Sequence, residues 1–175
     1  MREQKIRPLE RHYQIASGIA PSELSLAGVC STCRGKCCIG RTMVTAEERQ
    51  AIVAYARVDH FVYWQENMWY LERGACPYLK DGLCSVQEVK PLVCQIFPLV
   101  PRVVYGELWF YCVGECDAGL KLPPNFVDKA VKLARAFFRD IRLTTYESYW
   151  NENKIGDFDD ERVQFKVRVF DNREK

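Results

Sequence analysis

The chain has 175 residues, 48% of them hydrophobic, which is enough for one domain with a buried core. Its formal net charge of +2 at pH 7 gives no electrostatic argument for nucleic acid or an anionic membrane as a partner. No apolar run approaches the roughly 20 residues that span a bilayer, so no membrane association is expected. The first residues, from Met1 to Lys5, lack the apolar core of a secretory signal, and a cytoplasmic protein is therefore predicted.

The first half of the chain is predicted to form short helical elements and a strand. A weak helical pattern over residues 15–26 is interrupted by a glycine and a proline, which predicts short helical turns. Thr45-Ala46-Glu47-Glu48 has the form of a capping box, with a hydroxyl at the helix cap and a carboxylate three residues later. We expect the helix that it opens to run to about Arg57. Aromatic and branched residues over 67–72 predict a strand.

The middle of the chain is predicted to consist of short elements joined by tight turns. Between Cys76 and Cys84, the pair Asp81-Gly82 is expected to reverse the chain and bring the two cysteines together. Ser85-Val86-Gln87-Glu88 is a second capping-box pattern and predicts a short helix. A following helix, which carries Cys94, is expected to end before Pro98.

The last part of the chain predicts a hairpin, a long helix and a strand. The hairpin covers 103–111, with Gly106 as the first central residue of its two-residue turn. Apolar residues recur at helical spacing over 126–149, which predicts an amphipathic helix with one face on the core. Residues 163–169 alternate between apolar and polar side chains, which predicts a one-sided strand that joins the hairpin or forms an open edge.

These elements predict an α+β fold. We expect a small cysteine-rich metal-binding domain with a few short helices, a small antiparallel sheet and a long C-terminal amphipathic helix. A single domain is predicted over 1–175, with a core at 28–150, an N-terminal arm at 1–27 and a C-terminal strand at 162–170.

The nine cysteines indicate metal binding, because four of them fall within Cys30-Ser31-Thr32-Cys33-Arg34-Gly35-Lys36-Cys37-Cys38. In a C-x-x-C step, a tight turn would let two thiolates bind one metal ion. Arg34 and Lys36 place positive charge beside these thiols, which favours the thiolate form. A disulfide framework fits poorly, because the number of cysteines is odd, Cys37 and Cys38 are adjacent, and a secretory signal is not expected.

The cysteines belong to a longer ordered series of motifs between Cys30 and Gly114. The series is Cys30-x-x-Cys33-x-x-x-Cys37-Cys38, Val44-Thr45 with Glu48, Cys76-Pro-Tyr-Leu-x-Asp-Gly-Leu-Cys84, Pro91-Leu-Val-Cys94, Phe97-Pro98 and Cys112-x-Gly114. With this series the chain resembles the YkgJ-type cysteine-cluster family of zinc- or iron-chelating domains. The resemblance implies eight ligand cysteines: Cys30, Cys33, Cys37, Cys38, Cys76, Cys84, Cys94 and Cys112. Cys116 has no counterpart in the pattern.

The identity of the metal is left open by the number of ligands. The thiols can form two four-cysteine sites, or one such site with additional structural cysteines. Four thiolates suit zinc and a [4Fe–4S] cluster alike. Adjacent cysteines such as Cys37 and Cys38 suit a cluster, or two neighbouring sites, better than a single tetrahedral ion. We therefore expect an iron–sulfur cluster as cofactor, with zinc as the alternative.

The sequence favours a metal-binding module over an enzyme. Only His12 and His60 could transfer protons near neutral pH, and neither the radical-SAM cysteine spacing nor a Gly-rich phosphate-binding motif occurs. The expected function is that of a cluster-carrying module or an accessory subunit, which implies a protein partner in a larger assembly. A zinc-binding structural protein, or a cluster-dependent enzyme or enzyme component of a protein-modifying or redox system, remains the alternative.

Overall fold

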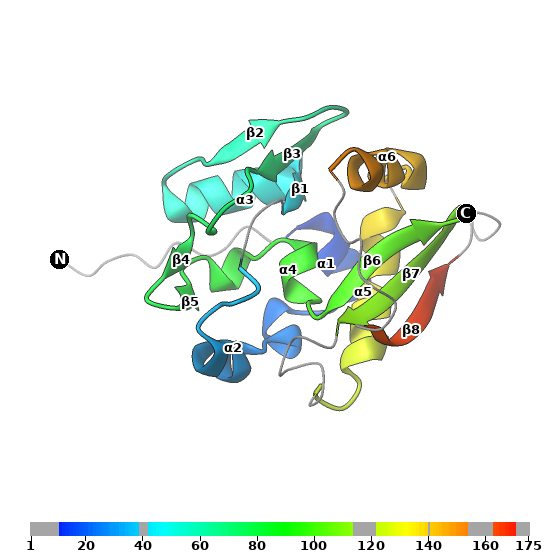
Figure 1. Cartoon of the computed structure of the whole chain (residues 1–175), viewed down its shortest axis with the longest axis horizontal. Helices are drawn as coiled ribbons and strands as arrows, with labels where there is room; N and C mark the ends of the chain where they lie inside the picture. Colours follow the sequence, from blue (N-terminus) through cyan, green and yellow to red (C-terminus); the bar gives the residue numbers. More distant parts are fainter. Residues whose placement is uncertain (1–10, 39–41, 114–121, 140, 154–162, 171–175) are drawn as a thin grey trace.

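The computed structural model of the chain describes residues 11–38, 42–113, 122–139, 141–153 and 163–170. The helices in these ranges are α1 (His12–Ser17), the 3-10 helix η1 (Pro21–Leu24), α2 (Ala27–Cys33), α3 (Ala46–Ala56), the 3-10 helix η2 (Gln87–Val89), α4 (Leu92–Gln95), α5 (Phe126–Phe138) and α6 (Leu143–Asn153). The strands are β1 (Met43–Thr45), β2 (Phe61–Tyr63), β3 (Met68–Leu71), β4 (Leu79–Lys80), β5 (Leu83–Cys84), β6 (Leu99–Val104), β7 (Glu107–Val113) and β8 (Val163–Phe170). Short helices and small antiparallel sheets confirm the predicted α+β fold (Figure 1).

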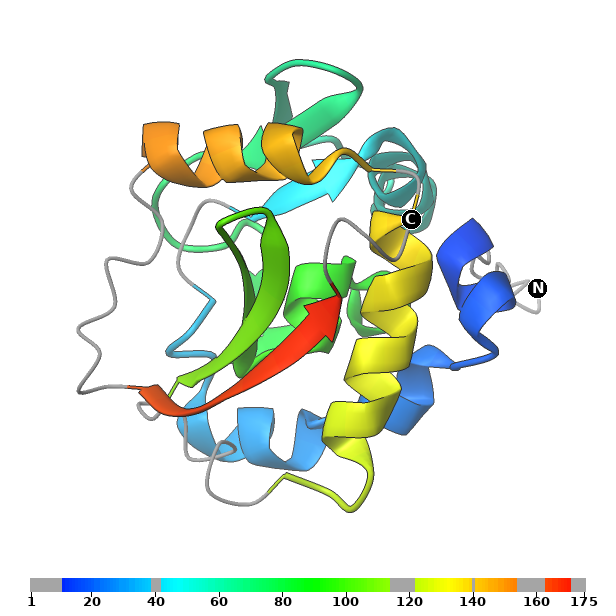
Figure 2. The same ribbon diagram turned by 90° about the vertical axis from the view of Figure 1, so that its right-hand side faces the viewer.

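The larger hydrophobic core lies between α5 and a three-stranded sheet. In this sheet the central strand β7 pairs antiparallel with β6 and β8. Alternate residues of β7, such as Leu108 and Phe110, share the core with Leu133 and Phe137 of α5. Figure 2 shows α5 beside the sheet and α1 on the other side of α5, where Tyr13 of α1 also enters this core. The strand predicted at 163–169 therefore joins the sheet of the hairpin.

The smaller core lies under α3, the sheet β1-β3-β2 and the β4–β5 hairpin. Its fully buried side chains are Val44, Ile52, Leu71, Tyr78, Val86 and Val89. The predicted capping box opens α3, since Glu48 N donates to Thr45 Oγ1 at 3.2 Å and Thr45 N donates to Glu48 Oε2 at 3.1 Å. The helix ends at Ala56, followed by Arg57 in a left-handed conformation. The prediction of α3 and of the strand β3 is thus confirmed.

Two tight turns set the register of the hairpins. Asp81 and Gly82, with φ of 51° and 78°, reverse the chain between β4 and β5 as predicted. In the β6–β7 hairpin the central residues are Tyr105 and Gly106, with φ of 53° and 77°. Gly106 is therefore the second central residue and not the first, because Val104 and Glu107 form the last pair of the ladder.

The helix predicted over 126–149 is two helices, because α5 ends at Phe138 and α6 begins at Leu143. At about 100° per residue, an unbroken helix would turn Leu143 and Tyr146 away from the face that carries Phe137. The break lets both join the larger core, where Leu143 is 3% exposed and Tyr146 is 1% exposed. Among the described residues, no helix is both long and apolar enough to cross a bilayer.

The second predicted capping box is not formed. Ser85 Oγ donates instead to the carbonyl oxygen of Tyr78 at 2.8 Å, which closes the β4–β5 hairpin. The short helix η2 begins only at Gln87 and has no side-chain cap. The Ser85 hydroxyl, which the local pattern predicts as a helix cap, is therefore used in a hydrogen bond outside the helix. The division of the chain into an arm, a core and a terminal strand stays a prediction.

Candidate metal centre

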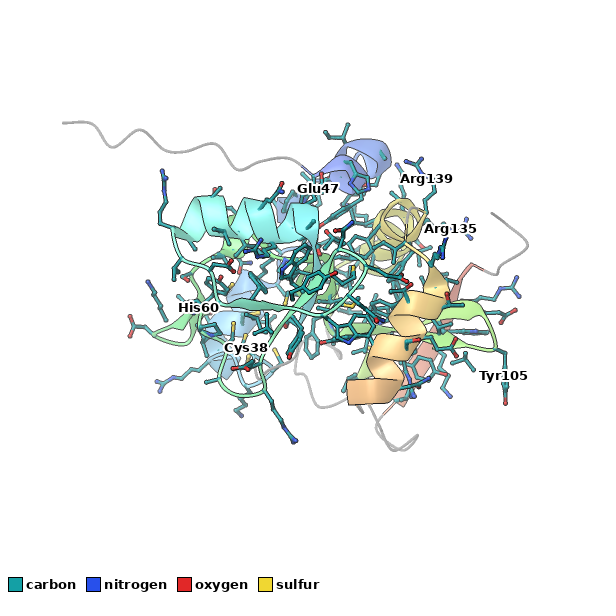
Figure 3. All side chains as sticks on the ribbon, turned by 90° about the horizontal axis from the view of Figure 1, so that it is seen from above. Cys38, Glu47, His60, Tyr105, Arg135 and Arg139 are labelled. Carbon is teal, nitrogen blue, oxygen red and sulfur yellow. The ribbon has the colours of Figure 1, made fainter. Side chains whose placement is uncertain are left out.

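Four cysteines from separate parts of the chain lie close enough to influence one another's ionisation. We call Cys38, Cys76, Cys84 and Cys94 the four-thiol group. Charge on Cys38 raises the pKa of each of the other three thiols, although burial is the larger cause in every case. Figure 3 shows sulfur atoms gathered in the region around the labelled Cys38. The structure thus brings these four of the eight predicted ligands near one another, and Cys37 contacts the group through its hydrogen bond to Cys38.

Backbone contacts hold this group in place. Cys76 N donates to the carbonyl oxygen of Cys38 at 3.0 Å, which joins the end of the first cysteine motif to the β4–β5 hairpin. Cys84 lies opposite Leu79 in that hairpin. Cys94 is carried by α4, where its N–H donates to the carbonyl oxygen of Pro91 at 3.0 Å. The predicted approach of Cys76 and Cys84 through the Asp81-Gly82 turn agrees with this arrangement.

Gly35 permits the close packing of the first cysteine motif on β4. Its φ is +69°, and a Cβ atom there would lie 2.6 Å from Leu79 Cδ1 and 3.4 Å from Cys38 Sγ. Cys38 N donates to the carbonyl oxygen of Gly35 at 2.8 Å, which closes the turn after α2. A side chain at this position would separate Cys38 from the hairpin that carries the next two thiols.

The thiols differ strongly in acidity. A hydrogen bond from Cys37 lowers the pKa of Cys38 to about 6, helped by the positive charge of Lys90 and opposed by burial. Burial raises the pKa of Cys94 to about 12, against the influence of Lys90 and of Thr42, whose Oγ1 lies 3.9 Å from Cys94 Sγ. Burial raises the pKa of Cys84 as well, and the charge of Lys90 opposes this effect. Lys90 thus favours the thiolate form of these cysteines, and the same effect of Arg34 and Lys36 stays a prediction.

The other predicted ligands occupy different surroundings. Cys30 and Cys33 lie on α2, a helix and not the predicted tight turn, and Cys33 Sγ donates to the carbonyl oxygen of Cys30 at 3.6 Å. Cys37 is exposed next to Cys38. Cys112 is buried in the larger core, with Sγ 3.9 Å from Gln164 Oε1. Cys116, which has no counterpart in the family pattern, lies outside the described residues. The ligand roles of the other cysteines stay predictions.

The donor set fits a metal held by thiolates. Within the described part of the chain, no group of three or more His, Cys, Asp or Glu side chains is already arranged to hold a metal ion. Rotation about χ1 moves a cysteine sulfur between three staggered positions without moving the backbone, so these sulfur positions are not the only ones open to the four-thiol group. Four thiolates are a complete ligand set for zinc or for a [4Fe–4S] cluster. Cys38 has the lowest pKa of the four thiols and would ionise most readily, whereas metal binding would have to displace the protons of the other three.

A pocket of about 310 Å³ adjoins the cysteine segments. It is lined by Tyr55, Ala56, Val58, His60, Pro77, Tyr78, Lys80 and Ser85. Pro77 and Ser85 directly follow Cys76 and Cys84 in the sequence. The exposed ring of His60 stands edge-on to Tyr78, with 5.3 Å between the ring centroids. Polar side chains such as His60 and Lys80 therefore lie beside the chain segments that carry Cys76 and Cys84.

Sequence reasoning missed a set of buried polar side chains behind Lys90. Glu48 was assigned only to the capping box, yet it is buried and also accepts hydrogen bonds from Tyr13 Oη at 2.8 Å and Leu92 N at 2.6 Å. Arg11 is buried beside it and donates to the carbonyl oxygens of Val89 and Lys90. Burial raises the pKa of Glu48, and the nearby Arg11 opposes this effect. No local pattern signals such a cluster, because a single charged residue in a short N-terminal helix is normally exposed.

Comparison with known proteins identifies one family. The model of the CxxCxxCC family, described as "Putative zinc- or iron-chelating domain", matches residues 29–124. This range contains all four members of the four-thiol group. Neither the curated proteins nor the solved structures compared with the chain give a match.

Proposed function

Because the chain belongs to the CxxCxxCC family of zinc- or iron-chelating domains, we propose that it holds an iron–sulfur cluster of the [4Fe–4S] type through cysteine thiolates. The protein acts as a cluster-carrying module or an accessory subunit of a larger assembly. The observation that carries this proposal is that Cys38, the two hairpin cysteines Cys76 and Cys84, and Cys94 of α4 lie close enough to influence one another's pKa. Cys30, Cys33, Cys37 and Cys112 are proposed as ligands of a second four-cysteine site or as structural cysteines.

The electrostatics of the site support an anionic centre. A [4Fe–4S]²⁺ core with four thiolates carries a net charge of about −2, which neighbouring positive charge must offset. Lys90 acts on Cys38, Cys84 and Cys94, and is therefore placed to offset it. The adjacent Cys37 and Cys38 favour the cluster, because two successive thiols reach different sides of the backbone and suit a body larger than one ion.

Zinc is the second candidate, and the number of converging thiols favours it as much as it favours the cluster. A tetrahedral zinc site uses four thiolates and carries the same formal charge. The role would then be structural, because four protein ligands leave no open position on the metal.

The surroundings of the site support a module and not an enzyme. Both histidines are exposed, and His12 pairs with Glu47 of α3, away from the cysteines. The strand β8 lies at the edge of its sheet, and Tyr105 at the hairpin turn is fully exposed, which offers surface to a protein partner. We place the protein in the cytoplasm, where reducing thiol pools keep cysteines available for metals.

Metal analysis and an absorption spectrum of anaerobically purified protein test the proposal. Brown protein with about four iron and four sulfide per chain, and a broad band near ~400 nm that dithionite bleaches, is expected. Colourless protein that still holds one zinc ion after reconstitution with iron and sulfide would contradict the cluster and support a zinc site. Cys84→Ser should lose the metal, whereas Cys116→Ser, the control, should keep it.

A further inference from the structure

A buried polar cluster joins the N-terminal helix to the segment that carries Lys90 and Cys94. We call Arg11, Tyr13 and Glu48 the polar cluster; their exposed fractions are 1%, 0% and 1%. Arg11 and Tyr13 precede residue 29, where the family match begins. The cluster is therefore partly a feature of this chain outside the matched domain.

Glu48 fixes the start of α4. Its Oε1 accepts hydrogen bonds from Leu92 N at 2.6 Å and from Tyr13 Oη at 2.8 Å, while Oε2 accepts from Thr45 N. Leu92 is the first residue of α4, and Cys94 is the third. One carboxylate thus caps α3 through its own capping box and also holds the helix that carries a proposed metal ligand.

Arg11 holds the residues immediately before α4. Its Nη1 donates to the carbonyl oxygen of Val89 at 3.1 Å and also to that of Lys90. The Lys90 carbonyl also accepts a hydrogen bond from Gln95 Nε2 at 2.5 Å. The backbone on both sides of Pro91 is therefore fixed, by Arg11 before it and by Glu48 after it. This stretch sets where Lys90 and Cys94 meet the other thiols.

Burial of these charges is costly and calls for a physical reason. Removing a carboxylate and a guanidinium from water costs several kcal/mol each, even after relaxation. A capping box alone needs no such burial, because it functions at a solvent-exposed helix start. From the three hydrogen bonds that join these side chains to the segment around Pro91, we infer that Glu48 and Arg11 are positioning residues for the metal centre. This inference rests on the proposed function.

The test compares Glu48→Gln with Glu47→Gln, using Co²⁺ as the probe under anaerobic conditions. Glu47 is a matched control, because it pairs with His12 and so joins the same two helices, but at the surface (Figure 3). Competition with a chelator measures Co²⁺ affinity, and alkylation followed by mass spectrometry measures the protection of each cysteine. For Glu48→Gln we expect affinity to fall by about tenfold, as for supporting residues of metal sites, and Cys94 to lose protection before Cys33 does.

Glu47→Gln should leave the affinity and the protection of Cys94 unchanged. Equal behaviour of the two variants, or equal loss of protection at every cysteine in Glu48→Gln, would overturn the inference, since the role would then be one of general stability. Arg11→Lys and Arg11→Gln form a second series in case Glu48→Gln does not fold. Affinity should decrease from wild type to Arg11→Lys to Arg11→Gln, and three equal affinities would contradict the role. Wild-type protein that binds no Co²⁺ through its thiolates would overturn this inference, and wild-type protein that also holds no cluster after reconstitution with iron and sulfide would overturn the proposed function.

Discussion

The thiol of Cys38 accepts a hydrogen bond from Cys37 and lies near Lys90, which together lower its pKa to about 6. The thiol of Cys94 has the same Lys90 as a neighbour, but burial raises its pKa to about 12. In the metal-free protein Cys38 is therefore the more readily ionised of the two thiols, while Cys94 stays protonated at pH 7. A metal ion would meet Cys38 as its first ligand and would then have to displace the proton of Cys94.

Alkylation of the metal-free protein at different pH values should reveal this difference. The rate at Cys38 is expected to rise with a midpoint near pH 6, whereas Cys94 should stay unmodified up to about pH 9. Cys37→Ala removes the hydrogen-bond donor, which is the largest cause, and should move the midpoint of Cys38 upward. In urea-unfolded protein both cysteines should react with the midpoint of an ordinary thiol, 9.0. Equal midpoints for Cys38 and Cys94 in the folded chain would contradict the geometry of the four-thiol group.

The same shift has a defined effect on the stability of the metal-free protein. The folded-state pKa of Cys38 lies below its ordinary value of 9.0, so its contribution is fully present above about pH 9. That contribution decreases as the pH falls and is lost below about pH 6. For Cys37→Ala, urea unfolding between pH 6 and 9 should therefore show a smaller gain of stability with pH than for wild type. Identical pH slopes in the two proteins would rule out the role of Cys37.

At the scale of elements, the turn after α2 is fitted closely to the β4–β5 hairpin. A Cβ atom at Gly35 would contact Leu79, and the positive φ of this residue adds strain for any side chain. Gly35→Ala should therefore lower the free energy of unfolding by about 2 kcal/mol or more, measured by urea denaturation. Gly28→Ala is the control, because Gly28 lies in α2 with nothing near its Cβ position, and alanine there should stabilise by about 0.5–1 kcal/mol. A neutral Gly35→Ala would mean that α2 and the hairpin are not in contact.

The elements that the sequence predicts correctly are those fixed by neighbouring residues. The hydroxyl of Thr45 and the pair Asp81-Gly82 determine a helix start and a turn through local bonds and local dihedral angles. Ser85 carries the same local pattern as Thr45, but a carbonyl seven residues earlier in the chain takes its hydroxyl. The break before α6 likewise depends on tertiary packing, because it lets Leu143 enter the larger core. The helical spacing of apolar residues in the sequence carries no information on this packing.

The candidate site divides in the same way. Cysteine spacing and the resemblance named all of the four-thiol group, because thiols in ordered motifs are rare enough to be recognised. The geometry that relates Cys94 to Cys38 required the tertiary structure. The polar cluster could not be predicted, because Arg11 and Glu48 are 37 positions apart and neither residue type suggests burial.

At the scale of the whole molecule, the chain has two hydrophobic cores of unequal size. The larger contains most of the buried residues of α5, α6 and the sheet β6-β7-β8, as well as Cys112. Among the described residues the smaller contains six buried side chains, and Cys76 and Cys84 pack against it. A core of this size provides little stability alone, as in small domains that depend on metals or disulfides. The four-thiol group therefore lies where a bound metal adds most to stability.

Hydrogen exchange with and without metal should show this division within one chain. Binding of a metal stabilises the segments that supply its ligands and those that pack on them. Metal-free protein is expected to exchange the amides of α3 and of the β4–β5 hairpin much faster than the metal-bound form. The amides of α5 should change little, because its apolar face is buried against the β6–β8 sheet and α1. Cys84→Ser, which removes one proposed ligand from the hairpin, should resemble the metal-free protein even with metal present. Equal protection of α3 and α5 by the metal would show instead that the two cores unfold as one cooperative unit.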